Sequence, residues 1–336
     1  MDPRASRIAP ALVLALLAWA PGATAQNVLR FPGKTVEVIG LEDWTLQMLA
    51  DSVARYGDGV TLDSPDAQRV IHDRLRFPAS AMRTFMSPSE DPYTLIHVVE
   101  PADSARVRLH RRGADTADVR PAWAAVADFA RRKQWRFIAA LYAWPRKEVP
   151  GYAAADSAEF RLAWDFWTAS RDRDRSDSVA IQVLSSDPTV QDRMVAASLL
   201  AYTPREEGDR RWLALFSALL DESEYVASTA ATALEAALRD SREVDWSPIV
   251  ADVHAVLDGA NPRELDTAAQ VLLQAGVDER WAVPLLAGGG RGLLALAGAD
   301  HWEMSLTARQ LLAALRGEDF GLEMELWRAW VNSLRP

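Results

Sequence analysis

In the second half of the chain, an alanine stands four residues ahead of a leucine at four places. Residues four apart lie on one face of an α-helix, so each pair offers a small and a large side chain to the same neighbour. The leucines recur at positions 200, 234, 272 and 312, a spacing that indicates an α-solenoid of stacked helix pairs. The pairs are Ala196 and Leu200, Ala230 and Leu234, Ala268 and Leu272, and Ala308 and Leu312.

Each copy is predicted to contain two helices joined by a short turn. We expect the leucine to fill the space between copies and the alanine to let the neighbouring helix come close. One helix pair has too little apolar surface to be stable alone, so stacking supplies its partner. A last helix, 322–331, is expected to close the open end. The predicted pairs are 177–185 with 192–200, 212–220 with 225–238, 248–257 with 263–275, and 281–286 with 304–315.

These residues resemble the HEAT-repeat family over roughly residues 177–316. That family often has valine and arginine just ahead of the alanine; here Arg193 keeps the arginine in the first copy and Val226 keeps the valine in the second. The third and fourth copies have neither. The resemblance implies a curved stack whose second helices line a concave surface used for protein binding. The alternative is an ordinary helical bundle with accidental spacing, which the four filled copies disfavour.

The first part of the chain, 1–25, has the pattern of a secretory signal peptide. Arg4 and Arg7 precede a short apolar run at positions 9–20, and Ala23-Thr24-Ala25 forms an A-x-A cleavage site. A transmembrane anchor is the alternative, but spanning a bilayer takes about 20 apolar residues and this run is shorter. We therefore expect an exported protein, periplasmic or extracellular and of bacterial type, with no integral membrane anchor after cleavage.

Composition narrows the range of partners. The chain of 336 residues contains 37 basic and 47 acidic residues and no cysteine. Without positions 1–25 the balance is 35 against 46, a net charge of −11. Such a surface repels nucleic acid and anionic lipid. The absence of cysteine excludes disulfides, thiolate metal sites and a lipid attached to cysteine.

Residues 27–150 are predicted to form a small α+β domain. The segment 34–39 reads as a strand because it is rich in β-branched residues and ends at Gly40. Helices are expected over 42–56 and from Ser64 to about Leu75. A further helix is expected over 121–132, whereas 135–144 is ambiguous between strand and helix. The predicted fold is mainly α: this domain, then a HEAT-like α-solenoid of about four helix pairs with a capping helix over 155–336.

Two more strands, 93–100 and 104–111, are predicted to form a hairpin through a Pro101-Ala102-Asp103 turn. In the second strand basic residues would alternate with apolar ones. Such a strip suits an anionic ligand or an acidic partner segment. A solvated or edge-protecting face is the plainer interpretation. The candidate binding residues are Arg106, Arg108, His110 and Arg112.

No catalytic motif is recognisable. The five histidines form no i,i+4 pair and no His-Glu-x-x-His pattern, so no metal is predicted. The glycine-rich segment 288–292 lacks the spacing and ending of a phosphate loop, and we interpret it as a turn between helices. Most of the 13 tryptophans, including Trp212, Trp246 and Trp281, are expected to pack in the core.

The sequence therefore predicts a non-enzymatic scaffold without a cofactor, whose solenoid surface binds a protein or peptide partner in the cell envelope. The first alternative is an enzyme or enzyme subunit with an unrecognised active site in 27–150 and the solenoid as docking platform. The second is a structural adaptor whose two parts recognise each other. The identity of the partner and the oligomeric state are not encoded in any recognisable pattern.

Overall fold

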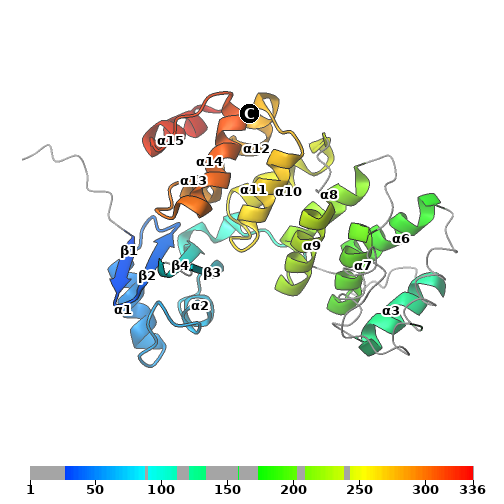
Figure 1. Cartoon of the computed structure of the whole chain (residues 1–336), viewed down its shortest axis with the longest axis horizontal. Helices are drawn as coiled ribbons and strands as arrows, with labels where there is room; N and C mark the ends of the chain where they lie inside the picture. The colour runs from blue at the N-terminus through cyan, green and yellow to red at the C-terminus, as the bar shows by residue number, and fades with distance from the viewer. Residues whose placement is uncertain are drawn as a thin grey trace, which may run out of the picture.

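The computed structural model describes residues 27–87, 90–111, 121–133, 158, 173–202, 209–237 and 243–335. These residues form a mainly α-helical protein with one small sheet at the N-terminal end (Figure 1). The predicted signal peptide, the ambiguous segment 135–144 and Arg112 lie outside the described residues.

The sheet is mixed and has four strands in the order β1-β2-β4-β3. Strands β2 and β4 pair in parallel, and the other two pairs are antiparallel. The predicted strands at 34–39 and 93–100 are confirmed as β2 and most of β4, whereas β1 and β3 were not predicted. The strands are β1 (Val28–Phe31), β2 (Lys34–Ile39), β3 (Ala79–Ser87) and β4 (Glu90–Val99).

Helix α1 (Leu46–Tyr56) covers one face of the sheet and begins later than the predicted residue 42. The reason is the buried carboxylate of Glu100, which accepts the backbone N–H groups of Glu42, Asp43 and Trp44 at 2.7–2.9 Å. These bonds hold residues 42–44 as a loop, so the helix starts only where Thr45 caps the N–H of Met48.

A second helical segment packs on the same face. Ser64 accepts the N–H of Asp66, and the chain then forms α2 (Ala67–Arg69) and a π-helical turn, η1 (Val70–Arg74). A helical segment therefore lies where the helix from Ser64 to about Leu75 was predicted. Most of it is a π-helical turn and not an α-helix. The core of this face contains Val36, Leu49, Val53, Ile71 and Ile96.

The predicted hairpin after β4 is wrong. Residues Pro101–Arg106 form a 3-10 helix, η2, and no strand follows it among the described residues. The β pairing of His110 among the described residues is an isolated parallel bridge to Asp221 in the helical part. The alternation of Arg106 and Val107 does not create two faces, because the chain crosses over to the helices instead of turning back on the sheet.

The helical part consists of two contacting rows. Helices α6, α8, α10 and α12 contact one another in succession, and so do α7, α9, α11 and α14. The bounds are α3 (Pro121–Lys133), α6 (Arg173–Ser186), α7 (Val190–Tyr202), α8 (Arg210–Ser217), α9 (Glu224–Ala237), α10 (Val250–Leu257), α11 (Leu265–Gln274), α12 (Ala282–Leu286), α13 (Arg291–Ala297), α14 (Trp302–Arg316) and α15 (Met324–Ser333).

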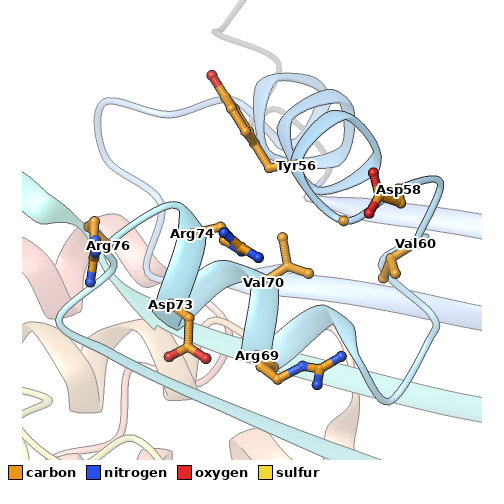
Figure 2. A pocket seen from close by; sticks show the side chains of 9 residues that line it. Tyr56, Asp58, Val60, Arg69, Val70, Asp73, Arg74 and Arg76 are labelled. Carbon is orange, nitrogen blue, oxygen red and sulfur yellow. The ribbon is translucent and has the colours of Figure 1, made fainter.

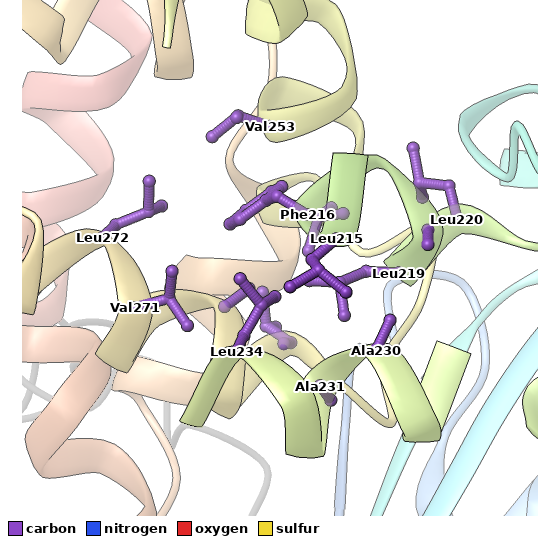
Figure 3. Close-up of a cluster of buried hydrophobic side chains, with 14 of the residues drawn as sticks. Leu215, Phe216, Leu219, Leu220, Ala230, Ala231, Leu234, Val253, Val271 and Leu272 are labelled. Carbon is purple, nitrogen blue, oxygen red and sulfur yellow. The ribbon is translucent and has the colours of Figure 1, made fainter. Parts of the chain in front are cut away.

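The alanine and leucine repeat positions all lie in the second row and are all fully buried. Figure 3 shows three of them, Ala230, Leu234 and Leu272, within the cluster of buried side chains between α8, α9, α10 and α11. The packing role that was predicted for these positions requires them to be completely buried, as they are.

The longest spacing, between Leu272 and Leu312, has a structural cause. Helix α13, which was not predicted, stands between α12 and α14 and lengthens the last copy. The predicted turn at 288–292 therefore ends at Gly290, directly ahead of α13.

The other face of the sheet packs against the helices. Ile39 and Leu95 belong to the same buried cluster as the helical core, and the rings of Phe85 and Tyr93 lie against His301, just ahead of α14. The sheet is thus enclosed between α1 and η1 on one side and α11, α13 and α14 on the other. Helix α3 packs on α7, where Arg131 binds Asp192 with two hydrogen bonds of 2.9 and 3.0 Å.

One ion pair lies inside the helical core. Arg193 on α7 donates to both carboxylate oxygens of Asp221 at 2.8 and 2.9 Å and to the carbonyl of Asp187 at 2.7 Å. The two side chains are 1% and 0% exposed. The arginine that the resemblance pointed to therefore joins the turn of one helix pair to the turn of the next.

We predict that Arg193→Met lowers the free energy of unfolding by about 3–5 kcal/mol, because it removes the buried guanidinium that donates to both oxygens of the Asp221 carboxylate. The urea midpoint of the purified protein measures this loss. The matched control is Arg328→Met, which removes an exposed partner of Glu325 and should cost less than about 1 kcal/mol. Equal losses in the two variants would contradict the role assigned to the buried pair.

Candidate functional site

The predicted basic strip does not form a free surface. Of its described members, Arg106 and His110 contact carboxylates of the helical part, whereas Arg108 is exposed and its Nε donates to the carbonyl of Ala105 at 3.4 Å. For these two residues, carboxylates of the same chain, Asp258 and Asp252, occupy the place of the anionic partner that was considered as one alternative.

Arg106 joins the sheet to the end of α10. Its guanidinium donates to the carbonyl of Asp258, and its Nε lies 3.3 Å from the Asp258 carboxylate as an ion pair. Asp103 and Glu42 lie 3.3 and 3.4 Å from its Nη1. The side chain is only 13% exposed. Arg291, which begins α13, pairs with Asp103 at 2.8 Å and extends this contact between the two parts of the chain.

His110 binds the turn between α8 and α9 through its backbone. Its N–H donates to the carbonyl of Leu220 at 2.7 Å, and its carbonyl accepts from Glu222 at 3.3 Å. Its ring Nε2 lies 3.2 Å from Asp252 on α10, a carboxylate that also accepts the hydroxyl of Ser217. Segment 101–111 therefore follows the helix turns, crossing from α10 to α8.

We predict that Arg106→Gln lowers the free energy of unfolding by about 1–3 kcal/mol, because it leaves Asp258 without its charged donor. Arg108→Gln is the matched control in the same segment and should change it by less than about 0.5 kcal/mol. Urea unfolding measures both variants, and amide exchange over 101–111 should quicken only in the first. Equal behaviour would show that Arg106 does not hold the contact.

A second contact between sheet and helices surrounds Glu37. Its carboxylate is 4% exposed and accepts the hydroxyl of Tyr93 and, at 2.8 Å, the N–H of Asp300. Burial raises the pKa of Glu37, although these hydrogen bonds oppose the shift. The ring of His301 lies 4.5 Å from that of Tyr93. All four groups are used in packing the sheet on the helices.

His97 is the buried histidine of the sheet. It is 4% exposed and faces a cavity of about 10 Å³ together with Arg83, Asp266 and Met304. That space suits one water molecule at most. Burial, with a smaller contribution from Arg106 and Arg83, lowers the pKa of His97 to about 3. An active site at His97, which would have favoured the enzyme alternative, has no room for a substrate there.

The buried His97 makes stability depend on pH. Its folded pKa of about 3 lies below the ordinary value of 6.5, so the unfolded chain takes up the proton first as pH falls. Its contribution is complete above about pH 6.5 and is lost as pH falls toward 3. We predict that His97→Gln flattens the fall of the free energy of unfolding between pH 6.5 and 4, measured by urea titration. An unchanged slope would contradict this.

Two larger cavities lie on either side of η1. The first, which we call the turn cleft, has a volume of about 510 Å³ and separates the N-terminal part from the helix turns. One wall contains Gln68, His72 and Ser80, and the opposite wall contains Glu222 and Arg263. The two walls come from segments far apart in the sequence, so only the docking of the sheet on the helices creates this cleft.

The turn cleft offers both polar and apolar groups. Val107 and the 39% exposed Leu109 add apolar surface to it, and Ser80 Oγ is buried without a hydrogen bond to any described residue. Arg263 and Glu224 pair with each other at 3.2 Å. Such a mixture suits a peptide, which presents backbone donors and acceptors together with apolar side chains.

The second cavity, which we call the arginine pocket, lies between η1 and the end of α1 and has a volume of about 530 Å³ (Figure 2). Its lining includes Arg69, Arg74 and Arg76, together with Asp58 and Asp73. The exposed Asp73 carboxylate lies 2.8 Å from His72 Nδ1, and this hydrogen bond lowers the pKa of Asp73. This pocket was not predicted, because a π-helical turn gathers arginines that follow no simple period.

The tryptophans singled out in the sequence lie in different environments. Trp212 and Trp246 are buried in the helical core as predicted, and Trp281 is half-buried. Trp302, at the start of α14, is 64% exposed.

Across the residues that the structure describes, no three histidine or acidic side chains gather as metal ligands. In the same residues no helix has the length and apolar character needed to cross a bilayer.

Comparison with known protein families, with curated proteins and with solved structures finds no match to this chain. The chain's own residues must therefore indicate its function.

Proposed function

We propose that the protein is an exported, non-enzymatic scaffold that binds an extended segment of a partner protein in the cell envelope. In this proposal the two rows of helices form a HEAT-like α-solenoid, and the turn cleft is its binding surface. The observation that carries the proposal is the cleft itself. It is open, has room for several side chains and is lined by the turn between α8 and α9 and the turn between α10 and α11.

The turns suit recognition because packing does not fix their outward residues. The repeat positions in α9 and α11 are fully buried, whereas Glu222, Glu224 and Leu109 around the cleft are exposed. Solenoid proteins separate packing from binding in this way, since each repeat contacts its neighbours through one set of positions and its partner through another.

The rigid frame of the cleft also supports binding. Arg193 fixes the Asp221 turn from inside the core, and the backbone of His110 fixes it from outside. A preorganised surface loses less conformational freedom on association, so more of the contact energy contributes to affinity.

Site-specific photo-crosslinking in the native envelope tests the proposal. We predict that a photoreactive residue at Leu109, inside the cleft, captures one discrete partner protein. The same residue at Leu322, which is 75% exposed and lies just ahead of α15, serves as control and should not capture it.

A second variant makes the outcome specific. Glu222→Lys reverses a charge on the exposed wall of the cleft and should reduce crosslinking at Leu109 at least about tenfold, the effect of about 1.4 kcal/mol. Crosslinking of equal strength at Leu109 and Leu322, or no effect of Glu222→Lys, would count against a partner segment in the cleft.

A further inference from the structure

Two residues that line the arginine pocket have a left-handed backbone conformation, which is strained for every residue except glycine. Asp58 has φ 54° and Arg76 has φ 61°, and they are the two non-glycine residues with positive φ in the described part of the chain. Each stands shortly beyond the end of a helical segment, α1 or η1. A left-handed residue that ends a helix is usually glycine, because any Cβ is strained there.

The chain uses glycine at a left-handed helix end where no neighbour limits the side chain. Gly276, just beyond α11, has φ 71°, and a Cβ there would meet no atom within 4 Å. A charged side chain at each of the two strained positions therefore suggests a use for the side chain itself, since strain of this kind gathers at functional sites. Aspartate tolerates the left-handed region better than most residues, so Arg76 is the stronger of the two observations.

The charges of the pocket are incompletely paired. Arg69 pairs with Asp66 at 3.0 Å, and Asp73 pairs with His72. Among the described residues, no ion pair forms at Arg74, Arg76 or Asp58. Asp58 also lies at the C-terminal end of α1, where the helix dipole disfavours a negative charge. The positive groups thus stand in a chain of net charge −10, where they form a local site of attraction for anions.

The geometry separates the charges that have no ion-pair partner among the described residues, whereas the paired Arg69 and Asp73 lie between them. Figure 2 shows the guanidinium of Arg74 directed toward Val70 beneath the end of α1, with Arg76 beyond it on one side and Asp58 and Val60 on the other. An apolar stretch formed by Val60 and Val70 thus lies between the guanidinium of Arg74 and the carboxylate of Asp58. Tyr56, 55% exposed, stands at the rim. A volume of about 530 Å³ is within the range of small-molecule sites, roughly 300–1,000 Å³.

We infer that the arginine pocket binds a small dipolar ligand of the amino-acid class. Arg74 and Arg76 bind its carboxylate or another oxyanion, Asp58 binds its protonated amine, and its carbon chain lies over Val60 and Val70. This site is separate from the turn cleft and does not depend on the proposed function.

Calorimetric titration of the purified protein at pH 7 tests the inference with a matched set of probes. Glycine, γ-aminobutyrate and 6-aminohexanoate carry both charges at increasing separation, whereas hexanoate and hexylamine each carry one. We expect one of the dipolar probes to bind at least about tenfold more tightly than either single-charge probe. If none of the three exceeds the single-charge probes, the inference is overturned.

Three variants assign the roles. Arg74→Gln and Arg76→Gly should each weaken the best dipolar probe at least about tenfold, and they should weaken hexanoate as well. Asp58→Gly should weaken the dipolar probe but leave hexanoate binding unchanged or stronger.

Stability separates this role from a structural one. Arg76→Gly and Asp58→Gly relieve left-handed strain, so both should raise the thermal midpoint while binding falls. A lower midpoint in both variants, with binding unchanged, would show that the two side chains serve the fold and would overturn the inference.

Discussion

Asp221 and Asp258, two carboxylates at neighbouring helix turns, each bind groups from distant parts of the chain. Asp221 accepts hydrogen bonds from the backbone N–H of Ser223 and from Nε and Nη2 of Arg193. Asp258 accepts the backbone N–H of Arg291 and forms an ion pair with Arg106. Each carboxylate thus accepts a backbone N–H group at the start of a helix and also binds the guanidinium of an arginine from another part of the chain. Because these groups are buried, their pairing fixes how the elements align.

The position of the sheet follows from this constraint. Arg106 lies a few residues beyond the end of β4, so its pairing with Asp258 draws the chain away from the sheet and along the helix turns. His110 continues the same path with backbone bonds at the turn before α9. A sheet held at this edge buries its second face on α11 and α14 and leaves the turn cleft beside η1. The cleft is therefore a consequence of the docking, as are the contacts of Glu37 and His97.

The elements that could be predicted from the sequence are those with strong local signals. The β-branched run at β2, the capped helix ending near Tyr56 and the second-row helices with their alanine and leucine pairs all lie where they were expected. Two differences from the prediction depend on distant partners. The loop at 42–44 is held by Glu100, and η2 replaces a strand because Arg106 binds Asp258. None of these partners follows from a local period or turn signal, so local patterns do not reveal them.

By itself the sequence determined the helical periodicity and the packing positions, because small and large side chains at fixed spacing specify a buried helix face wherever that face finds a neighbour. It also determined the acidic balance and the lack of thiol chemistry, which are properties of composition alone. The tertiary structure decided which charged side chains form ion pairs inside the protein and which line a cavity that a ligand can enter. Arg106 and Arg193 are used in buried pairs, whereas Arg74 and Arg76 line a pocket. An arginine looks the same in sequence in both cases, since its role depends on whether the folded chain brings a carboxylate within reach.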